Sequence, residues 1–589
     1  MDINYKRDKY LSEFSIKTLE DRYFVDGETS PQEAFARAAK AFADNDAHAQ
    51  RLYDYASKLW FMFSTPILSN GGTKRGMPIS CFLNYVEDSR EGITNHYTEN
   101  AYLSSVGGGV GGCWNEIRSV GSTTSNGSES TGVIPFLKVV DAEMLAFSQG
   151  VTRRGSYAAY LDISHPEVEE FLDVRKPTGG DVNRKSTNLH HGVLLSDEFM
   201  ELIEKATKIE GFDDSWDLVD PHSGEVKKTV SAKTLWVKLI QNRVETGEPY
   251  IMFKDTVQEA VPEFQQNLGL TVHHSNLCSE ITLATDKDRT AVCCLSSVNL
   301  EEYDEWKDND DFIPDLVRML DNVIEFFINN APDQLSRASY SAMRERSLGL
   351  GAMGFHAYLQ RHSIPFESAM AKGRNLQMFG RIKGEAVRAT RQLAAERGEC
   401  PDGEGYGVRN AHLLAIAPNA SSSIICGNTS PSIEPYRANA FTQKTKSGSS
   451  LLKNEYLEDI LQDLGYDTDD VWKSILTNGG SVQHLEFLDQ WTKDVFKTAV
   501  EIDQRWVVEM AGDRQEFICQ SQSLNVFFPA NISKQELHAV HMMAWKRGVK
   551  TLYYLRSEAM KRAENVSDEV LRQYIFDSID DEGCLACEG

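Results

Sequence analysis

The stretch Asn276-Leu277-Cys278-Ser279-Glu280 places a thiol between an amide and a carboxylate, each two residues away. A cysteine sulfur can carry a radical, a carboxylate can take up a proton and an amide can hold a hydroxyl group. In an extended segment, residues two apart point to the same side, so we expect these three side chains to converge on a polar substrate. A buried structural cysteine is the more common meaning of so short a pattern, so the interpretation depends on the other cysteines.

A second cysteine motif, Cys584-Leu585-Ala586-Cys587, lies close to the last residue. An exposed tail dithiol is typical of a reaction that consumes two electrons per turnover and is recharged by thiol–disulfide exchange. The other interpretation is half of a zinc site. No second Cys or His pair lies near it in the sequence, which counts against zinc.

Three further cysteines lie in segments that predict burial. Cys81 follows Ser80 after a stretch punctuated by glycine and proline, and Cys293 and Cys294 lie in the apolar run 291–295, which predicts a buried strand. If Cys81 and one of the other two meet beside Cys278, the site contains a reducing dithiol next to a thiol that can carry a radical. The alternative is that all three are small core residues.

Two segments are suited to bind phosphate. The turn Pro418-Asn419-Ala420-Ser421-Ser422-Ser423 offers hydroxyls and backbone amides for an anion at a helix N-terminus. The stretch 106–112, Val-Gly-Gly-Gly-Val-Gly-Gly, lacks large side chains and permits close backbone approach. Neither ends in the Gly-Lys-Ser/Thr of a Walker A loop, and each pattern is more often simply a loop.

The adjacent Tyr553 and Tyr554 have two interpretations. Neighbouring residues on a strand normally face opposite sides of the sheet, which makes them ordinary aromatic strand residues. If the two rings stack instead, they form a short hopping path for an oxidising equivalent.

Composition excludes several classes of protein. The chain has 589 residues, 41% of them hydrophobic and 25% charged, which is ordinary for a globular protein. Its formal charge of −26, with no strong basic patch, argues against non-specific nucleic-acid binding. No run approaches the ~18 apolar residues of a membrane span, and the N-terminus lacks a signal core. Ten cysteines in so long a chain are not a secreted disulfide framework, so a reducing cytoplasm is the expected setting.

The chain divides into three parts. Residues 1–62 predict a helical domain, with Ser30-Pro31 at a plausible helix start. Residues 63–564 alternate short apolar runs with helical stretches, which predicts an α/β fold. Residues 565–589 are rich in Asp, Glu and Gly and predict a flexible tail that carries the dithiol.

Taken in order, these motifs resemble the large, catalytic subunit of ribonucleotide reductase. The resemblance rests on Ser64-Thr65-Pro66, Ser80-Cys81, the glycine loop 107–112, Gln149-Gly150, the stretch 276–280, Cys293, the turn 418–423, Tyr553-Tyr554 and the C-terminal cysteines. Each piece is weak, and their joint occurrence is highly specific. It implies a ten-stranded α/β barrel with Cys278 on a finger loop through its centre.

The resemblance also implies residue roles. Cys278 carries a thiyl radical that abstracts the ribose 3′-hydrogen, Glu280 is the base on the 3′-hydroxyl, and Asn276 is its hydrogen-bonding partner. Cys81 and Cys293 are the dithiol that supplies two electrons; Cys293 is preferred because Cys294 falls on a variable position of the family pattern. The implied substrate-binding residues are Thr65, Ser80, Gly108, Asn276, Glu280, Pro418, Ser421, Ser422 and Ser423.

Three classes of the family differ in how they generate the radical. Tyr553 and Tyr554 resemble the class I relay, in which a separate metal-containing small subunit supplies the oxidising equivalent, so no metal site is expected in this chain. Class II enzymes use adenosylcobalamin and typically lack the tyrosine pair, and class III enzymes carry a glycyl-radical motif that the C-terminus lacks. Class II is the alternative within the family, and a non-catalytic nucleotide-binding scaffold is the alternative outside it.

Partners and regulation follow from the same resemblance. We expect a homodimer, diphosphate substrates, and a thioredoxin- or glutaredoxin-type reductant acting through Cys584 and Cys587. An N-terminal ATP-cone looks absent, as in compact enzymes encoded by some phages, for which the location is the host cytoplasm. A dNTP or ATP effector is expected at a specificity site, with the matching residues Asp88, Arg118, Gln149, Arg153 and Arg154.

Overall fold

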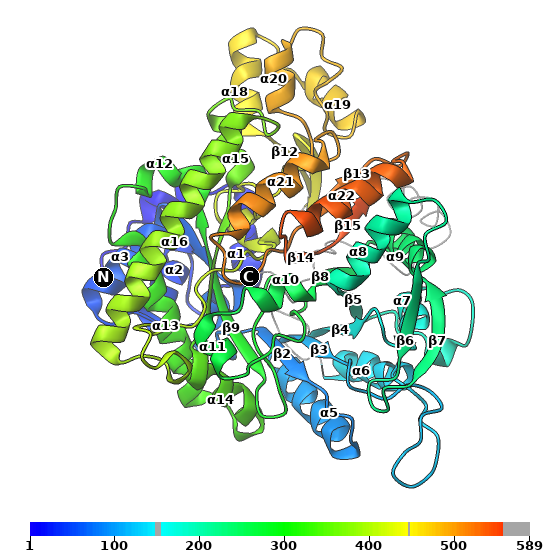
Figure 1. Ribbon diagram of the computed structural model, residues 1–589. Helices are drawn as coiled ribbons and strands as arrows, with labels where there is room; N and C mark the ends of the chain where they lie inside the picture. Colours follow the sequence, from blue (N-terminus) through cyan, green and yellow to red (C-terminus); the bar gives the residue numbers. More distant parts are fainter. Residues whose placement is uncertain (148–154, 446–447, 558–589) are drawn as a thin grey trace.

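The computed structural model describes residues 1–147, 155–445 and 448–557, and Figure 1 shows its architecture. The chain begins with a helical region made of η1 (Tyr5–Tyr10), α1 (Glu13–Arg22), α2 (Pro31–Ala41) and α3 (Asp46–Ser57). Ser30 caps α2 in a capping box with Glu33, and Pro31 is the first helical residue. Such a cap contributes about 1 kcal/mol, and it confirms the helix start predicted at Ser30-Pro31.

The first half of the barrel alternates strands with helices. After β1 (Phe61–Phe63) and α4 (Thr65–Asn70), its elements are β2 (Cys81–Tyr85), α5 (Arg90–Ser105), β3 (Gly109–Cys113), α6 (Ile134–Ala146), β4 (Ser156–Asp162), α7 (Val168–Leu172), η2 (Val182–Arg184), β5 (His190–Leu195), α8 (Asp197–Lys208), β6 (Ser215–Val219), β7 (Val226–Ser231), α9 (Ala232–Thr246), β8 (Tyr250–Phe253), α10 (Lys254–Glu259) and α11 (Glu263–Asn267). Strands β2, β3, β4, β5 and β8 pair in parallel in that order. The β6–β7 hairpin stands apart at the right of Figure 1.

The second half continues in the same manner. Its elements are β9 (Ala291–Asn299), η3 (Leu300–Glu302), α12 (Tyr303–Trp306), α13 (Phe312–Asn330), η4 (Asp333–Leu335), α14 (Ser336–Glu345), β10 (Leu348–Met353), α15 (Phe355–Arg361), α16 (Ala369–Arg397), η5 (Pro401–Gly403), α17 (Ala420–Ile425), α21 (Gln504–Gln515), β13 (Val526–Phe528), α22 (Lys534–Lys546), β14 (Thr551–Leu552) and β15 (Leu555–Ser557). Strand β9 pairs in parallel with β10, and parallel bridges then join β10 to segment 414–416 and that segment to Gln522. Segment 522–528, which includes β13, pairs in parallel with β15.

Two antiparallel pairings close the barrel. Strand β2 pairs with β9, and β8 pairs with β14. The result is a ring of ten extended segments, five in each half, when β14 and β15 are counted as the single segment 551–557. The segments are parallel within each half and antiparallel at the two junctions. The predicted ten-stranded α/β barrel is therefore confirmed, although several segments of the second half are joined by single bridges.

A separate lobe packs above the barrel in Figure 1. It is formed by β11 (Ala440–Thr445), β12 (Gly448–Lys453), α18 (Glu455–Leu464), α19 (Asp469–Thr477) and α20 (Gln490–Val495). Leu457, Leu461, Trp472 and Ile475 form an apolar cluster of its own. The sequence analysis did not anticipate this lobe. Within the described residues, no helix is long and apolar enough to span a bilayer.

Candidate active site

The finger loop, residues 268–290 between α11 and β9, runs inside the barrel, and three parts of the wall hold its backbone. The Tyr160 hydroxyl of β4 donates to the Asn276 carbonyl at 2.6 Å. Ser523 donates to the Cys278 carbonyl and Thr551 to the Ser279 carbonyl, both at 2.6 Å. These three bonds fix the position of the Cys278 backbone against both halves of the barrel.

The glycine stretch makes this threading possible. A Cβ atom on Gly111 of β3 would lie 2.0 Å from the Ser275 carbonyl oxygen and 2.8 Å from the Asn276 Cα. His274, on the same loop, bonds the Gly111 carbonyl through Nε2 at 3.0 Å. The approach predicted for this stretch was to a ligand; at Gly111 the structure instead places the chain's own finger loop against the glycine backbone.

The segment 276–280 is a tight turn and not extended, so that expectation was wrong. Ser279 adopts a left-handed conformation with φ of 65°, and the Asn276 Oδ1 accepts from the Glu280 and Ile281 backbone N–H groups at 3.1 and 3.2 Å. A side-chain oxygen that caps its own turn is a favourable alternative to extended backbone. The turn brings Asn276 and Glu280 together on one side of it.

This turn also fixes the direction of the amide. Because both backbone partners of Asn276 are donors, its oxygen faces them and its Nδ2 points away. The buried Nδ2 has no hydrogen-bond partner among the described residues, an arrangement that leaves a donor for a ligand. Glu280 is also fully buried and accepts from Ser523 at 3.2 Å.

Cys81 and Cys293 oppose each other where β2 meets β9. Directly opposed residues of an antiparallel pair have Cα atoms about 4.5–5.5 Å apart, within the range that a disulfide spans. Both thiols are reduced and buried. Burial raises the pKa of Cys293 well above its usual value, with Cys294, Cys81 and Glu280 adding to the rise and a Gln520 N–H opposing it.

Cys294 points to the other side of β9. Its sulfur lies 3.4 Å from the Leu320 carbonyl of α13, and it belongs to the core outside the barrel. The inward cluster instead contains Cys81, Cys293, Ile281 and Leu283. Strand alternation thus separates the two neighbouring cysteines, as the preference for Cys293 requires.

Tyr553 and Tyr554 lie between β14 and β15, with ring centroids 4.2 Å apart and planes at 53°. The Tyr553 hydroxyl donates to the Cys278 sulfur at 3.5 Å. The buried Arg243 donates to the Tyr553 carbonyl at 3.0 Å, and burial lowers the pKa of Arg243 to about 9. The two rings therefore lie in contact on the same side, as the second interpretation requires, but they are tilted and not stacked.

Two neighbouring residues at the end of α1 contact predicted substrate-binding residues from two segments, Thr65 and Ser421. Tyr23 bonds Thr65 hydroxyl to hydroxyl at 3.0 Å, and Arg22 donates to Ser421 at 3.5 Å. Thr65 begins α4, and Ser421 lies in the first turn of α17, so two helix N-termini converge. The buried Ser422 hydroxyl has no partner among the described residues.

The other predicted substrate residues lie as follows. Ser80 precedes β2, and its carbonyl accepts from the Gly109 N–H at 2.7 Å. Gly108 is packed so closely that a Cβ would lie 2.8 Å from the Leu103 carbonyl. Pro418 precedes Asn419, whose φ of 55° turns the chain into α17.

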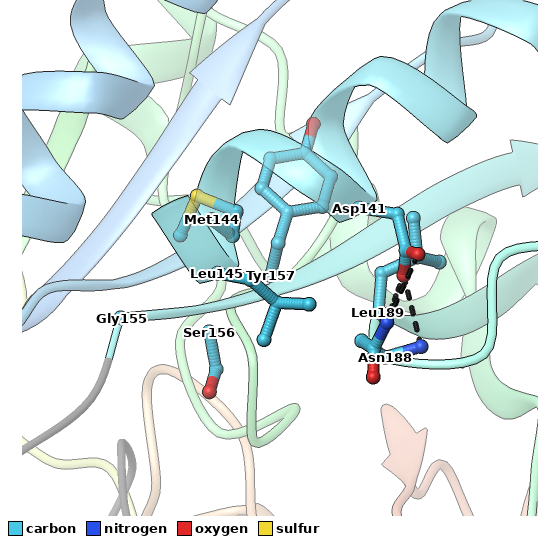
Figure 2. A pocket seen from close by; sticks show the side chains of 8 residues that line it. All are labelled: Asp141, Met144, Leu145, Gly155, Ser156, Tyr157, Asn188 and Leu189. Carbon is cyan, nitrogen blue, oxygen red and sulfur yellow. Dashed lines mark hydrogen bonds between the residues drawn. The ribbon is translucent and has the colours of Figure 1, made fainter. Parts of the chain in front are cut away.

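The predicted effector residues Asp88 and Arg118 meet outside the barrel. The Arg118 Nε donates to Asp88 at 2.8 Å, and both side chains are largely buried. A cavity of about 270 Å³ lies between α6, β4 and residues 188–189, and Asp141 on its wall accepts from the Asn188 side chain at 3.1 Å (Figure 2). Its wall includes Gly155, the first described residue after position 147.

Five predicted site residues lie outside the described part of the chain. Gln149, Arg153 and Arg154 fall in segment 148–154, and Cys584 and Cys587 fall in 558–589. Among the described residues, no group of three or more His, Cys, Asp or Glu side chains is arranged to hold a metal ion.

Several residues that build this site escaped the sequence analysis. Tyr160, Ser523 and Thr551 fix the loop, and Arg22 and Tyr23 reach the phosphate segments. All are common residue types, and all but Thr551, which lies two residues before Tyr553, are far from the motifs in sequence. Only the glycine stretch signalled where the loop passes.

Inside the closed barrel, the Tyr553 hydroxyl contacts the Cys278 sulfur, and Cys81 opposes Cys293 at the β2–β9 junction. The description "Ribonucleotide reductase, barrel domain" matches residues 79–404 and 401–555, and "Ribonucleotide reductase, all-alpha domain" matches residues 9–76, where no ATP-cone is found. The chain belongs to the ribonucleotide reductase large-subunit family.

Individual proteins agree with this assignment. The chain is 50% identical over 544 residues to the putative ribonucleoside-diphosphate reductase large subunit of Frog virus 3 (isolate Goorha), covering 92% of each chain. It is 43% identical over 638 aligned residues to the ribonucleoside-diphosphate reductase large subunit of Invertebrate iridescent virus 3, covering all of both. The Actinobacillus ureae class Id ribonucleotide reductase alpha subunit superposes with a TM-score of 0.82 at 35% identity, covering 95% of this chain and 98% of that one.

Proposed function

We propose that this chain is the catalytic subunit that reduces ribonucleoside diphosphates to 2′-deoxyribonucleoside diphosphates. The observation that carries the proposal is the Cys278 sulfur, fully buried inside the closed barrel and in contact with the Tyr553 hydroxyl at 3.5 Å. A dry, enclosed site protects a reactive radical from side reactions.

The chemistry at the ribose uses three loop residues and the dithiol. A Cys278 thiyl radical abstracts the 3′-hydrogen, Glu280 takes the 3′-hydroxyl proton and the Asn276 Nδ2 donates to a substrate hydroxyl. Cys81 and Cys293 then supply two electrons and two protons: the 2′-hydroxyl leaves as water, hydrogen replaces it and the two sulfurs become a disulfide. Cys278 returns the 3′-hydrogen and Glu280 the 3′-hydroxyl proton, which regenerates the thiyl radical. The opposed positions of Cys81 and Cys293 on β2 and β9 support this role.

The substrate diphosphate is assigned to the convergent starts of α4 and α17. Their backbone N–H groups and the hydroxyls of Thr65, Ser421, Ser422 and Ser423 suit an anion, and Arg22 adds a cation. Ser80, Gly108 and Pro418 complete the proposed binding residues.

The radical is assigned to a relay from a partner. A separate metal-containing small subunit oxidises Tyr554, Tyr554 oxidises Tyr553, and Tyr553 takes the hydrogen atom from Cys278. The 4.2 Å separation of the two rings supports the first transfer within the chain, and the 3.5 Å O–S distance supports the second.

Recharging is assigned to the tail. Cys584 and Cys587 reduce the internal disulfide and are themselves reduced by a thioredoxin- or glutaredoxin-type protein. These steps place the chain in a reducing compartment, the cytoplasm, or the host cytoplasm for an enzyme of viral origin.

Regulation is assigned to a homodimer. Tyr102 on α5, Val139 and Leu145 on α6, and Phe147 at the end of α6 are exposed apolar residues on two helices that pack together. Exposed apolar patches of this kind mark protein interfaces. The effector nucleotide is assigned to Asp88, Arg118, Gln149, Arg153 and Arg154.

The test is a turnover assay with the purified chain. We expect deoxyribonucleotide formation with a class I metal-containing small subunit and none with adenosylcobalamin. Turnover with adenosylcobalamin alone would move the enzyme to class II, and failure with both would favour the scaffold interpretation.

A further inference from the structure

Gln520 joins the finger loop to the dithiol. Its fully buried side chain lies just before segment 522–528. The Oε1 accepts from the Thr282 backbone N–H on the finger loop at 3.2 Å. The Nε2 donates to the Leu348 carbonyl of β10 at 2.9 Å and to the Cys293 sulfur at 3.5 Å.

The direction of this amide is determined by its partners. Thr282 N–H can only donate and the Leu348 carbonyl can only accept, so the oxygen faces Thr282 and the nitrogen faces Leu348 and Cys293. The backbone carbonyl of Gln520 accepts from Gln515 and from Lys550, both at 2.9 Å. Both hydrogens of the Gln520 side-chain amide are therefore used, one on the Leu348 carbonyl and one on the Cys293 sulfur. These bonds and those of the Gln520 backbone hold the donor in place against the sulfur.

The Cys293 sulfur is fitted closely on its other sides. A Cβ on Gly349 of β10 would lie 2.9 Å from it, so glycine is needed there to leave it room. The thiol makes one weak contact as a donor, to the Cys294 carbonyl at 3.8 Å. An N–H group at a buried sulfur favours the thiolate over the neutral thiol, because a hydrogen bond to a charged group is the stronger one.

We propose that Gln520 is a positioning residue that stabilises the Cys293 thiolate, so that reduction of the Cys81–Cys293 disulfide proceeds by attack at Cys81 with Cys293 as the leaving sulfur. This inference rests on the proposed function, which makes these two cysteines the dithiol. Burial raises the pKa of Cys293, and the Gln520 N–H opposes that rise. Because a thiol of lower pKa leaves faster in thiol–disulfide exchange, this N–H makes Cys293 a better leaving sulfur than burial alone would allow.

The electrons balance in two exchanges. An incoming thiolate bonds the Cys81 sulfur, the Cys81–Cys293 bond breaks, and its electron pair stays on Cys293 as a thiolate. A second thiolate then attacks the incoming sulfur and releases Cys81 as a thiolate. Both cysteines are protonated from the thiols that were oxidised, and the net change is two electrons and two protons.

The test uses the full chain with Cys584→Ser and Cys587→Ser, so that the tail takes no part. The protein is oxidised with diamide, treated briefly with 2-mercaptoethanol and quenched with acid, and peptide mass spectrometry locates the adduct. In the parent protein we expect the adduct on Cys81. With Gln520→Met we expect opening about tenfold or more slower, and a larger share of the adduct on Cys293.

Two further variants separate positioning from folding. Gln520→Glu keeps an acceptor for Thr282 and removes the donor on the sulfur, so it should shift the adduct as Gln520→Met does. Gln522→Met is the matched control: Gln522 is equally buried, but its side chain accepts from Arg514 and donates to Ala511 and Gln515, none of which contacts the dithiol, so it should leave the adduct position unchanged even if it lowers stability.

Two results would overturn the inference. The first is an adduct on Cys293 in the parent protein, and the second is an unchanged adduct position in both Gln520 variants. If no Cys81–Cys293 disulfide forms in the parent protein, the proposed dithiol fails as well, and this outcome is distinct from the other two.

Discussion

Gly111→Ala is the sharpest test of how the barrel holds its finger loop. The new Cβ would lie 2.0 Å from the Ser275 carbonyl oxygen, whereas real Cβ contacts are essentially never below 3.0 Å. The loop backbone therefore has to retreat by about 1 Å. Overpacking of this kind costs roughly 1–3 kcal/mol of stability, and a 1 Å displacement of reacting groups costs about a hundredfold in rate.

We therefore expect Gly111→Ala to fold with reduced stability and to lose about 99% of its turnover. The assays are chemical denaturation, followed by circular dichroism, and reductase turnover with the small subunit at saturating substrate. Gly384→Ala is the matched control, because it lies within α16 and its Cβ would meet nothing within 4 Å. A helix-interior Gly→Ala change should stabilise by about 0.5–1 kcal/mol and leave turnover unchanged. Wild-type turnover in Gly111→Ala would refute the claim that this close approach positions the loop.

Three further predictions concern the relay, the tail and one buried carboxylate. Tyr554→Phe keeps the ring and removes the phenol proton, so turnover should fall to background while nucleotide binding, measured by calorimetry, persists; wild-type turnover would contradict the relay. The double change Cys584→Ser/Cys587→Ser should leave one burst of product per prereduced enzyme in a rapid quench and abolish thioredoxin-driven turnover, and loss of the burst would instead make the tail structural. Burial alone would raise the pKa of Glu248, but Arg175 and His190 outweigh burial and hold this pKa well below its usual value. The Glu248 carboxylate therefore contributes stability above about pH 4.3, and this contribution is lost as the pH falls. Glu248→Gln should therefore destabilise in denaturant titrations at pH 7, with a difference from wild type that shrinks at pH 4; an equal difference at both would contradict this sign.

The sequence predicted the parts of the site that carry their own chemistry. Cysteines, the tyrosine pair and the glycine stretch are recognisable because few other residues can carry a radical, exchange a disulfide or permit a close backbone approach. The alternating strand and helix patterns predicted an α/β fold, and the ten-stranded barrel was implied by the family resemblance alone. The contact of Cys81 with Cys293 depended on the resemblance, because pairing of β2 with β9 joins positions more than two hundred residues apart.

Other features could not be read from the sequence. The turn at 276–280 depends on Ser279 adopting a positive φ, which serine rarely does and which the surrounding bonds to Ser523 and Thr551 support. Gln520 looks like any polar residue near a strand until its three partners are brought together. The lobe of β11–β12 and α18–α20 follows ordinary patterns, and nothing in them distinguishes an inserted lobe from the barrel wall.

The central claim is that the Cys278 sulfur abstracts the 3′-hydrogen of a ribonucleotide. The most direct measurement compares Cys278→Ala with Cys294→Ala, in the presence of the small subunit, on a ribonucleoside diphosphate deuterated at the 3′ position. We predict an isotope effect on product formation in the wild type and in Cys294→Ala, whose sulfur faces α13, and no product from Cys278→Ala. Product formation by Cys278→Ala would contradict the account. So would a wild-type enzyme that shows no 3′ isotope effect during a single turnover.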